Sequence, residues 1–104
     1  MIYRVAFTRR AQADLHGPFD YLADRFGLTN AQRYVEQIEK ACLSLGTIPN
    51  RGTEHSNLRP GLRTMGFRRR ATIAFRVKDD SVTILRILYG GRSVEIAFSS
   101  TKDE

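Results

Sequence analysis

The stretch that decides the fold covers residues 58–91, LRPGLRTMGFRRRATIAFRVKDDSVTILRILYGG. From residue 71 to 77 every second side chain is apolar, which is the period of a β-strand with one face against a core. Residues 82–89 are apolar on both faces, which favours an interior strand covered on both sides. The short acidic turn at 78–81 joins these strands, so they are predicted to form an antiparallel hairpin.

Residues 2–26 indicate a short strand followed by an amphipathic helix. Residues 2–7 alternate as a strand does, and the hydroxyl of Thr8 can accept from the free amides of a first helical turn. Because proline removes a helical hydrogen bond, Pro18 is expected to kink or split the helix near His16. The apolar stripe of this helix is Ala11, Leu15, Phe19, Leu22 and Phe26, and its wet face is Arg9, Arg10, Asp14, Asp20 and Asp24.

A second helix is predicted after Gly27, where a glycine suits the left-handed conformation that ends a helix. The spacing from Thr29 to Gln32 is that of a capping box. Because the link between the two helices is short, they are expected to run antiparallel as a helical hairpin. The apolar seam of the second helix is Leu28, Val35, Ile38, Cys42 and Leu45.

The remaining segments complete an α+β fold. Turn residues predict a loop from 47 to 60, and strands are expected at 62–67 and at 94–98. The order of elements predicts an N-terminal strand and an antiparallel helical hairpin packed on a small antiparallel sheet of three to five strands. A chain of 104 residues is expected to form one domain, residues 1–98, with a frayed tail at 99–104.

Composition argues against several functional classes. With two histidines, one cysteine and no recurring ligand spacing, neither a metal site nor a cofactor is expected. Phosphate-binding and dinucleotide-binding motifs are also missing from the sequence. Cys42 on the helical seam is interpreted as a small buried hydrophobe, and a single cysteine favours a reducing cytosol. No long apolar run predicts a membrane segment, so a cytoplasmic location is expected.

The positive charge is concentrated in the second half of the chain. Lys and Arg number 17 against 11 Asp and Glu, and 14 of the 17 are Arg. Residues 1–50 carry a net charge of +1, whereas residues 51–92 carry +7. Such a cluster indicates an acidic partner or a nucleic acid, with a merely solvated surface as the plain alternative. Arginine favours the first interpretation because its guanidinium fork matches carboxylates and phosphates.

RNA cleavage by a basic site is one chemical interpretation of this cluster. It requires one group to take the 2′-hydroxyl proton, another to protonate the leaving oxygen, and cations on the phosphate. Arginine stays protonated and cannot act as the base. Glu54, His55 and Tyr89 are the nearby candidates, although the first two fit a surface loop and Tyr89 fits sheet packing. A binding protein needs only the Arg-rich surface on a rigid sheet.

Four motifs in a fixed order resemble a known family. FTRRAQADL at 7–15, IPNRG at 48–52, LRPGLR at 58–63 and ILRILYGGR at 84–92 together resemble the ParE branch of the RelE/ParE toxins, the toxin halves of bacterial type II toxin–antitoxin modules. The likeness spans residues 3–98 and implies a RelE/ParE-like fold. Tyr89 departs from the pattern, since relatives often carry His there, and Gly17-Pro18 departs from a straight first helix.

The resemblance also implies a function. ParE relatives poison DNA gyrase, so the chain is expected to inhibit growth by non-catalytic binding, and a cognate ParD-like antitoxin is expected to neutralise it in a hetero-oligomer. The alternative is a ribosome-dependent mRNA endonuclease of the RelE type, with Arg63, Arg86 and Tyr89 as catalytic candidates. A third interpretation is a plain nucleic-acid-binding module. The expected target-binding residues are Arg59, Arg63, Arg68, Arg69, Arg70, Arg86 and Arg92, and the expected antitoxin-binding residues are Leu15, Phe19, Leu22, Tyr34, Arg68, Arg70 and Arg76.

Overall fold

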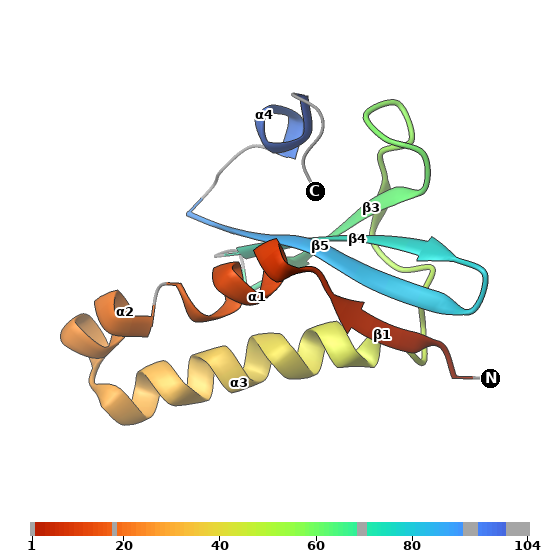
Figure 1. Cartoon of the computed structure of the whole chain (residues 1–104). Coiled ribbons are helices and arrows are strands. Elements are labelled where there is room, and N and C mark those ends of the chain that lie inside the picture. The colour runs from red at the N-terminus through yellow and green to blue at the C-terminus, as the bar shows by residue number, and fades with distance from the viewer. Residues whose placement is uncertain (1, 18, 69–70, 91–93, 100–104) are drawn as a thin grey trace.

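A five-stranded sheet lies between a layer of three helices and one short C-terminal helix (Figure 1). The computed structural model describes residues 2–17, 19–68, 71–90 and 94–99. The strands are β1 (Arg4–Phe7), β2 (Thr53–Glu54), β3 (Leu62–Phe67), β4 (Ala71–Lys78) and β5 (Ser81–Tyr89). The helices are α1 (Arg9–His16), α2 (Phe19–Phe26), α3 (Leu28–Ser44) and α4 (Val94–Ser99).

The strand order is β1-β5-β4-β3-β2, which confirms an α+β fold with a sheet of three to five strands. β3, β4 and β5 form the antiparallel meander that the sequence predicts, and Asp79 turns between β4 and β5 with a φ of 57°. β1 pairs with β5 in parallel, so the sheet is mixed where an antiparallel one was expected. Side chains alternate between the two faces of a strand in parallel and in antiparallel pairing alike, so the sequence pattern could not distinguish the two directions of β1.

A bulge in β5 explains why this strand is apolar on both faces. Phe75 pairs with Ile84 and Ala74 with Arg86, which leaves Leu85 as an extra residue. The extra residue shifts the alternation, so Ile84 and Ile87 both reach the core beneath the helices, while Leu85 and Leu88 reach the opposite face. β5 is therefore the interior strand that the sequence predicts.

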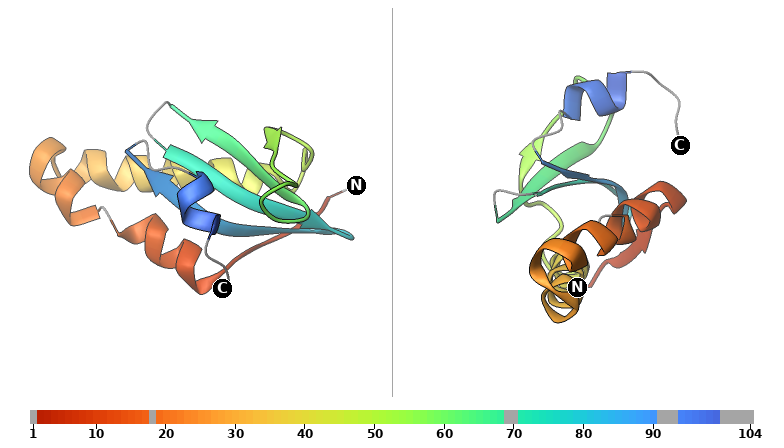
Figure 2. Two further views of the ribbon diagram at one scale, coloured as in Figure 1. Left: turned by 90° about the horizontal axis from the view of Figure 1, so that it is seen from above. Right: turned by 90° about the vertical axis from the view of Figure 1, so that its left-hand side faces the viewer.

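The first predicted helix is split, as expected from Gly17-Pro18. α1 ends at His16 and α2 begins at Phe19. Gly27, at a φ of 93°, then joins α2 to the antiparallel α3. The expected capping box is wrong, because α3 already begins at Leu28 and Gly27 itself occupies the cap position. α2 has no buried residue, and with the first turns of α3 it projects beyond the sheet (Figure 2).

Two apolar clusters fill the two faces of the sheet. The larger lies between the sheet and the helices α1 and α3, and it includes Ile38, Phe75 and Ile84, none of which is exposed. The smaller joins Leu62, Ala74, Leu85 and Leu88 of the opposite face to α4. It is a satellite of the main core, formed under the C-terminal helix.

The segment 94–98 is a helix rather than the strand that was expected. Val94 and Phe98 are one helical turn apart, and both pack on the apolar face formed by Leu85 and Leu88. The five residues fit a period of two as well as a spacing of four, and the available apolar face favours the helical choice. Ser99 is the last residue of α4, and residues 100–104 of the expected tail lie outside the described residues.

Truncating the interior strand tests this packing. Ile84→Ala is expected to lower the free energy of unfolding by about 2–5 kcal/mol, because it removes a fully buried side chain and leaves a cavity. Urea titration monitored by circular dichroism measures the change. Ile96→Ala, at a side chain that is 77% exposed, is the matched control and should change stability by less than about 0.5 kcal/mol. Equal losses in the two variants would contradict the assigned register.

Candidate functional site

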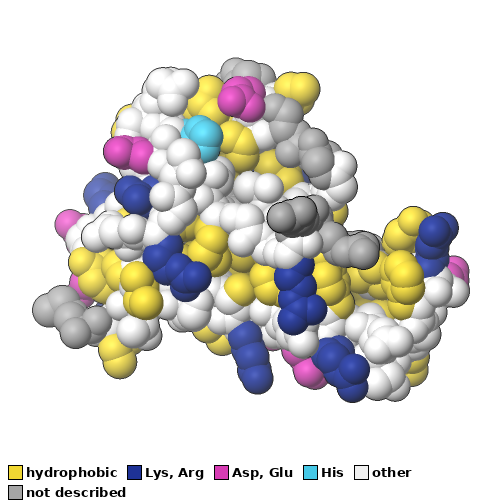
Figure 3. All heavy atoms as spheres, turned by 180° about the vertical axis from the view of Figure 1, so that it is seen from behind, with side chains coloured by type: hydrophobic (Ala, Val, Ile, Leu, Met, Phe, Trp, Pro, Cys, Tyr) yellow, Lys and Arg dark blue, Asp and Glu magenta, His cyan; other side chains and the backbone are white. Residues whose placement is uncertain are grey.

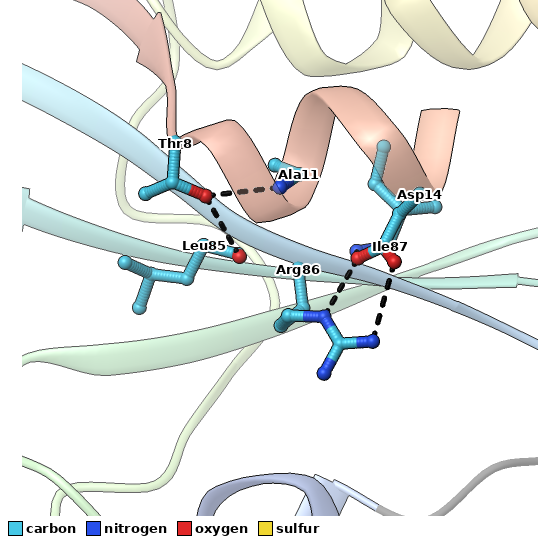
Figure 4. Close-up of polar contacts among 6 residues, drawn as sticks. All are labelled: Thr8, Ala11, Asp14, Leu85, Arg86 and Ile87. Atoms are coloured by element: carbon cyan, nitrogen blue, oxygen red, sulfur yellow. Dashed lines mark hydrogen bonds and ion pairs between the residues drawn. The ribbon is translucent and has the colours of Figure 1, made fainter. Parts of the chain in front are cut away.

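The most constrained polar contact in the molecule joins α1 to β5 (Figure 4). The Nε of Arg86 lies 2.7 Å from one carboxylate oxygen of Asp14, and its Nη2 lies 3.2 Å from the other. The backbone amide of Ile87 donates to the same carboxylate at 2.9 Å. Both charged side chains are largely buried, 9% and 13% exposed, so the pair is shielded from solvent.

This contact exists because, among the described residues, no strand pairs with β5 beyond the end of β1. The Thr8 amide donates to the carbonyl of Ile84, and the Thr8 hydroxyl donates to the carbonyl of Leu85 at 3.1 Å. The same hydroxyl caps α1 by accepting from the amide of Ala11, which confirms the predicted cap. Side chains of Thr8 and Asp14 thus bind edge groups of β5 where a strand would otherwise pair.

Sequence reasoning missed Asp14, which was assigned to the wet face of the helix. The available signal was Arg86, since an arginine within an apolar strand requires a buried counter-ion. Arg86 itself was predicted to bind a target. At 8% exposure and paired with Asp14, its guanidinium supports the fold and does not form part of an open surface.

Arg63, the second candidate shared by both functions, holds the loop that precedes β2. Its Nε donates to the carbonyl of Arg51 at 3.0 Å, and its Nη2 donates to the carbonyl of Asn50 at 3.4 Å. The proton-transfer candidates of the same region are also engaged. His55 lies 3.1 Å from the hydroxyl of Thr64, and Glu54 accepts from the hydroxyl of Ser56 at 2.6 Å.

Tyr89, the third catalytic candidate, turns its hydroxyl into the protein. The hydroxyl oxygen is buried and has no hydrogen-bond partner among the described residues. Burial raises the pKa of the Tyr89 phenol well above its ordinary value, with smaller contributions from Tyr34 and Asp14. A buried phenol with a raised pKa is a poor base for a substrate in solvent.

Cys42 is also unsuited to act as a nucleophile. It is fully buried on the α3 seam, as the sequence predicts. Burial, followed by the charge of Glu39, raises the pKa of its thiol from 9.0 to about 12. Within the described residues, no group of three or more His, Cys, Asp or Glu could hold a metal ion, and no helix combines the length and apolar character needed to cross a membrane.

The other expected target-binding arginines lie at two separate places. Arg59 stacks on the ring of Phe98 in α4, 4.9 Å from its centroid. Arg68 follows β3 at a φ of 52° and is exposed, with its guanidinium 5.4 Å from the ring centroid of Phe67. Arg69, Arg70 and Arg92 lie outside the described residues.

The expected antitoxin-binding residues also separate. Leu15 is only 4% exposed, so its assignment to a binding surface does not fit, and it belongs to the core. Phe19 and Leu22 are half-buried on α2. Tyr34 packs edge-on against Phe67 with centroids 5.8 Å apart. Arg76 lies on β4 next to Phe75, and alternation points it to the sheet face opposite the helical hairpin.

The helical hairpin carries an apolar surface that the sequence assigned to the core. Phe26 and Leu28, 51% and 59% exposed, lie on either side of the turn between α2 and α3, whereas Tyr21, 58% exposed, lies about 140° around α2 from Phe26. Phe26 and Leu28 were expected on the buried seams. They are exposed because this end of the hairpin lies beyond the edge of the sheet, where no facing layer covers it. Large exposed apolar side chains grouped in this way mark an interaction surface.

Comparisons with known proteins agree on one family. Residues 5–94 match the family model described as the ParE toxin of the type II toxin–antitoxin system parDE. Toxin ParE3 of Caulobacter vibrioides is 34% identical over 87 residues, which cover 84% of this chain and 86% of that protein.

Solved structures extend the likeness to the fold. The chromosomal ParDE TA system from P. aeruginosa matches with a TM-score of 0.73 at 30% identity, covering 85% of this chain and 96% of that chain. The toxin–antitoxin complex RelBE2 from Mycobacterium tuberculosis matches with a TM-score of 0.63 at 22% identity, covering 88% and 95%. The second likeness concerns the fold alone.

Breaking the ion pair between Asp14 and Arg86 is expected to destabilise the protein. Arg86→Ala should lower the free energy of unfolding by about 3–5 kcal/mol, because it leaves the Asp14 carboxylate buried without a counter-ion. Adding Asp14→Asn to Arg86→Ala should restore part of this loss, since asparagine is neutral and still accepts from the amide of Ile87. Denaturant titrations of both variants measure this. A double variant less stable than Arg86→Ala would contradict the argument.

Removing the Tyr89 hydroxyl is not expected to lower the free energy of unfolding. Tyr89→Phe should leave the free energy of unfolding unchanged or raise it by up to about 1 kcal/mol, because an unpaired buried hydroxyl costs stability. The matched control is Thr8→Val, which removes a hydroxyl that makes two hydrogen bonds and should cost about 1–2 kcal/mol. A clear loss of stability in Tyr89→Phe would show that its hydroxyl has a partner.

Proposed function

Because the chain belongs to the ParE toxin family of type II toxin–antitoxin systems, we propose that it inhibits growth by binding and poisoning DNA gyrase. A cognate ParD-like antitoxin neutralises it in the cytoplasm by forming a hetero-oligomer. The gyrase target follows from the resemblance to the ParE branch. The antitoxin partner is supported by the likeness to the solved ParDE system.

One observation carries the choice of binding over catalysis: each catalytic candidate is buried or hydrogen-bonded within the chain, including the exposed Glu54, which accepts from Ser56. The Tyr89 hydroxyl is buried, and Arg86 is paired with Asp14. Arg63 binds two loop carbonyls, and His55 contacts Thr64. An mRNA endonuclease needs an acid and a base at the surface, whereas a gyrase poison needs only complementary contacts.

The exposed end of the helical hairpin is the surface that the antitoxin covers. Phe19 and Leu22 share one face of α2 with the exposed Phe26, and Leu28 continues this patch onto α3. An amphipathic or extended segment binds such a surface by inserting spaced apolar side chains. Acidic residues of the same segment pair with the exposed Arg68 beside β3.

A two-target assay tests the function. Purified toxin is added to gyrase with relaxed DNA in one tube and to translating ribosomes with mRNA in another. The expected result is loss of supercoiling in the first tube and intact mRNA in the second. Toxin preincubated with an equimolar amount of its ParD-like partner should leave supercoiling unchanged.

Tyr89→Phe separates the two mechanisms. A gyrase poison should keep its activity in this variant, whereas loss of a general acid or base would lower a cleavage rate by about 10²–10⁴-fold. Cleaved mRNA that disappears in Tyr89→Phe, together with normal supercoiling, would overturn the proposal in favour of a nuclease.

A further inference from the structure

The cations that remain on the surface gather along one flank of α3 and the neighbouring edge of β3. On α3, Arg33 and Lys40 are exposed and lie seven residues apart, so they project from the same flank about 10 Å from each other. Tyr34, beside Arg33, packs against Phe67 of β3, which places this flank next to β3.

Contacts between α3 and β3 bring two further cations to this flank. The Nη1 of Arg51 donates to the hydroxyl of Ser44 at the end of α3, 3.2 Å away. The carbonyl of Arg51 in turn accepts from Arg63 of β3. At the other end, Arg68 stacks on Phe67. We name this surface the basic edge, and it consists of Arg33, Lys40, Arg51 and Arg68.

Positive charge exceeds negative charge along the basic edge. Among the described residues, the one ion pair joins Asp14 to Arg86, so no carboxylate is paired with a cation of the basic edge. Glu36 lies three residues after Arg33 and four before Lys40, so one carboxylate lies between these two cations, whereas Glu39 projects from the other flank of α3. Figure 3 shows the molecule from behind, with Lys and Arg side chains spread over this face and an acidic side chain beside some of them.

We propose that the basic edge binds the phosphate backbone of duplex DNA. Its cations extend along a straight 17-residue helix, and a DNA strand presents one phosphate about every 3.4 Å of axis. The 10 Å between Arg33 and Lys40 therefore spans about three phosphates of one strand. Arginine, which supplies three of the four cations, suits phosphate recognition.

The surface favours a duplex over single-stranded nucleic acid. Recognition of single strands relies on aromatic side chains on which unpaired bases stack. The aromatic residues of the basic edge, Tyr34 and Phe67, are half-buried against each other and the core. Contacts with backbone phosphates require no such platform and are independent of sequence. The site shares Arg68 with the surface proposed for the antitoxin, but Arg33, Lys40 and Arg51 lie outside that surface, and the site does not depend on the gyrase proposal.

Salt dependence of binding tests the proposal with the full-length chain. A fluorescein-labelled 20-base-pair duplex of mixed sequence is titrated with the protein between 50 and 200 mM salt, and fluorescence anisotropy gives the affinity. About four phosphate contacts predict a slope of log affinity against log salt near −3.6. The double variant Arg33→Ala/Lys40→Ala should make this slope shallower by about 2.

The matched control removes the same charge elsewhere. Arg9→Ala/Arg10→Ala, at exposed positions of α1, should keep the slope of the unchanged protein. Equal changes in the two double variants would overturn the proposal, because net charge alone would then explain binding. So would undetectable binding to the duplex at 50 mM salt. Tighter binding of fluorescein-labelled polyglutamate than of DNA would also overturn it, and would assign the basic edge to an acidic protein.

Discussion

The carboxylate of Asp14 is the contact on which the packing of the first helix depends. β1 ends at Phe7, and from there β5 has no neighbouring strand on that side. Asp14 accepts from the amide of Ile87 and neutralises Arg86, while Thr8 binds the carbonyl of Leu85. The first helix therefore satisfies the sheet edge with side chains, and this fixes where the rest of the helical layer lies on the sheet.

The excess of arginine divides into structural and surface roles. Arg86 is buried in an ion pair, Arg63 holds a loop, and Arg59 covers the ring of Phe98. A net charge counted from the sequence does not distinguish these side chains from exposed ones such as Arg33 and Arg68. The bulge at Leu85 contributes to this division, because it rotates Arg86 out of the plain alternation of an apolar strand.

Local periodicity was sufficient to predict the β4–β5 hairpin, the cap at Thr8 and the split between α1 and α2, because each depends on neighbouring residues. Features that depend on distant partners escaped prediction. Asp14 was placed in solvent because its partner Arg86 is 72 residues away. The segment 94–98 was predicted as a strand, since the face that selects a helix is formed by β5. For the candidate site, the sequence predicted that arginines are important, but it did not predict which of them are buried.

β1 joins the sheet through residues far removed in the chain, since Arg4 pairs with Ser81 and Phe7 with Ile84. The strands β3, β4 and β5 can associate with near neighbours, each closing only a short loop. β1 and α1 can contact β5 only after β5 has formed. Bringing them to β5 closes the long segment between β1 and β5, and this loss of chain entropy precedes the stabilising contacts. Loop closure alone therefore favours assembly of the C-terminal meander before the N-terminal strand and helices dock onto it, which is opposite to the order of synthesis.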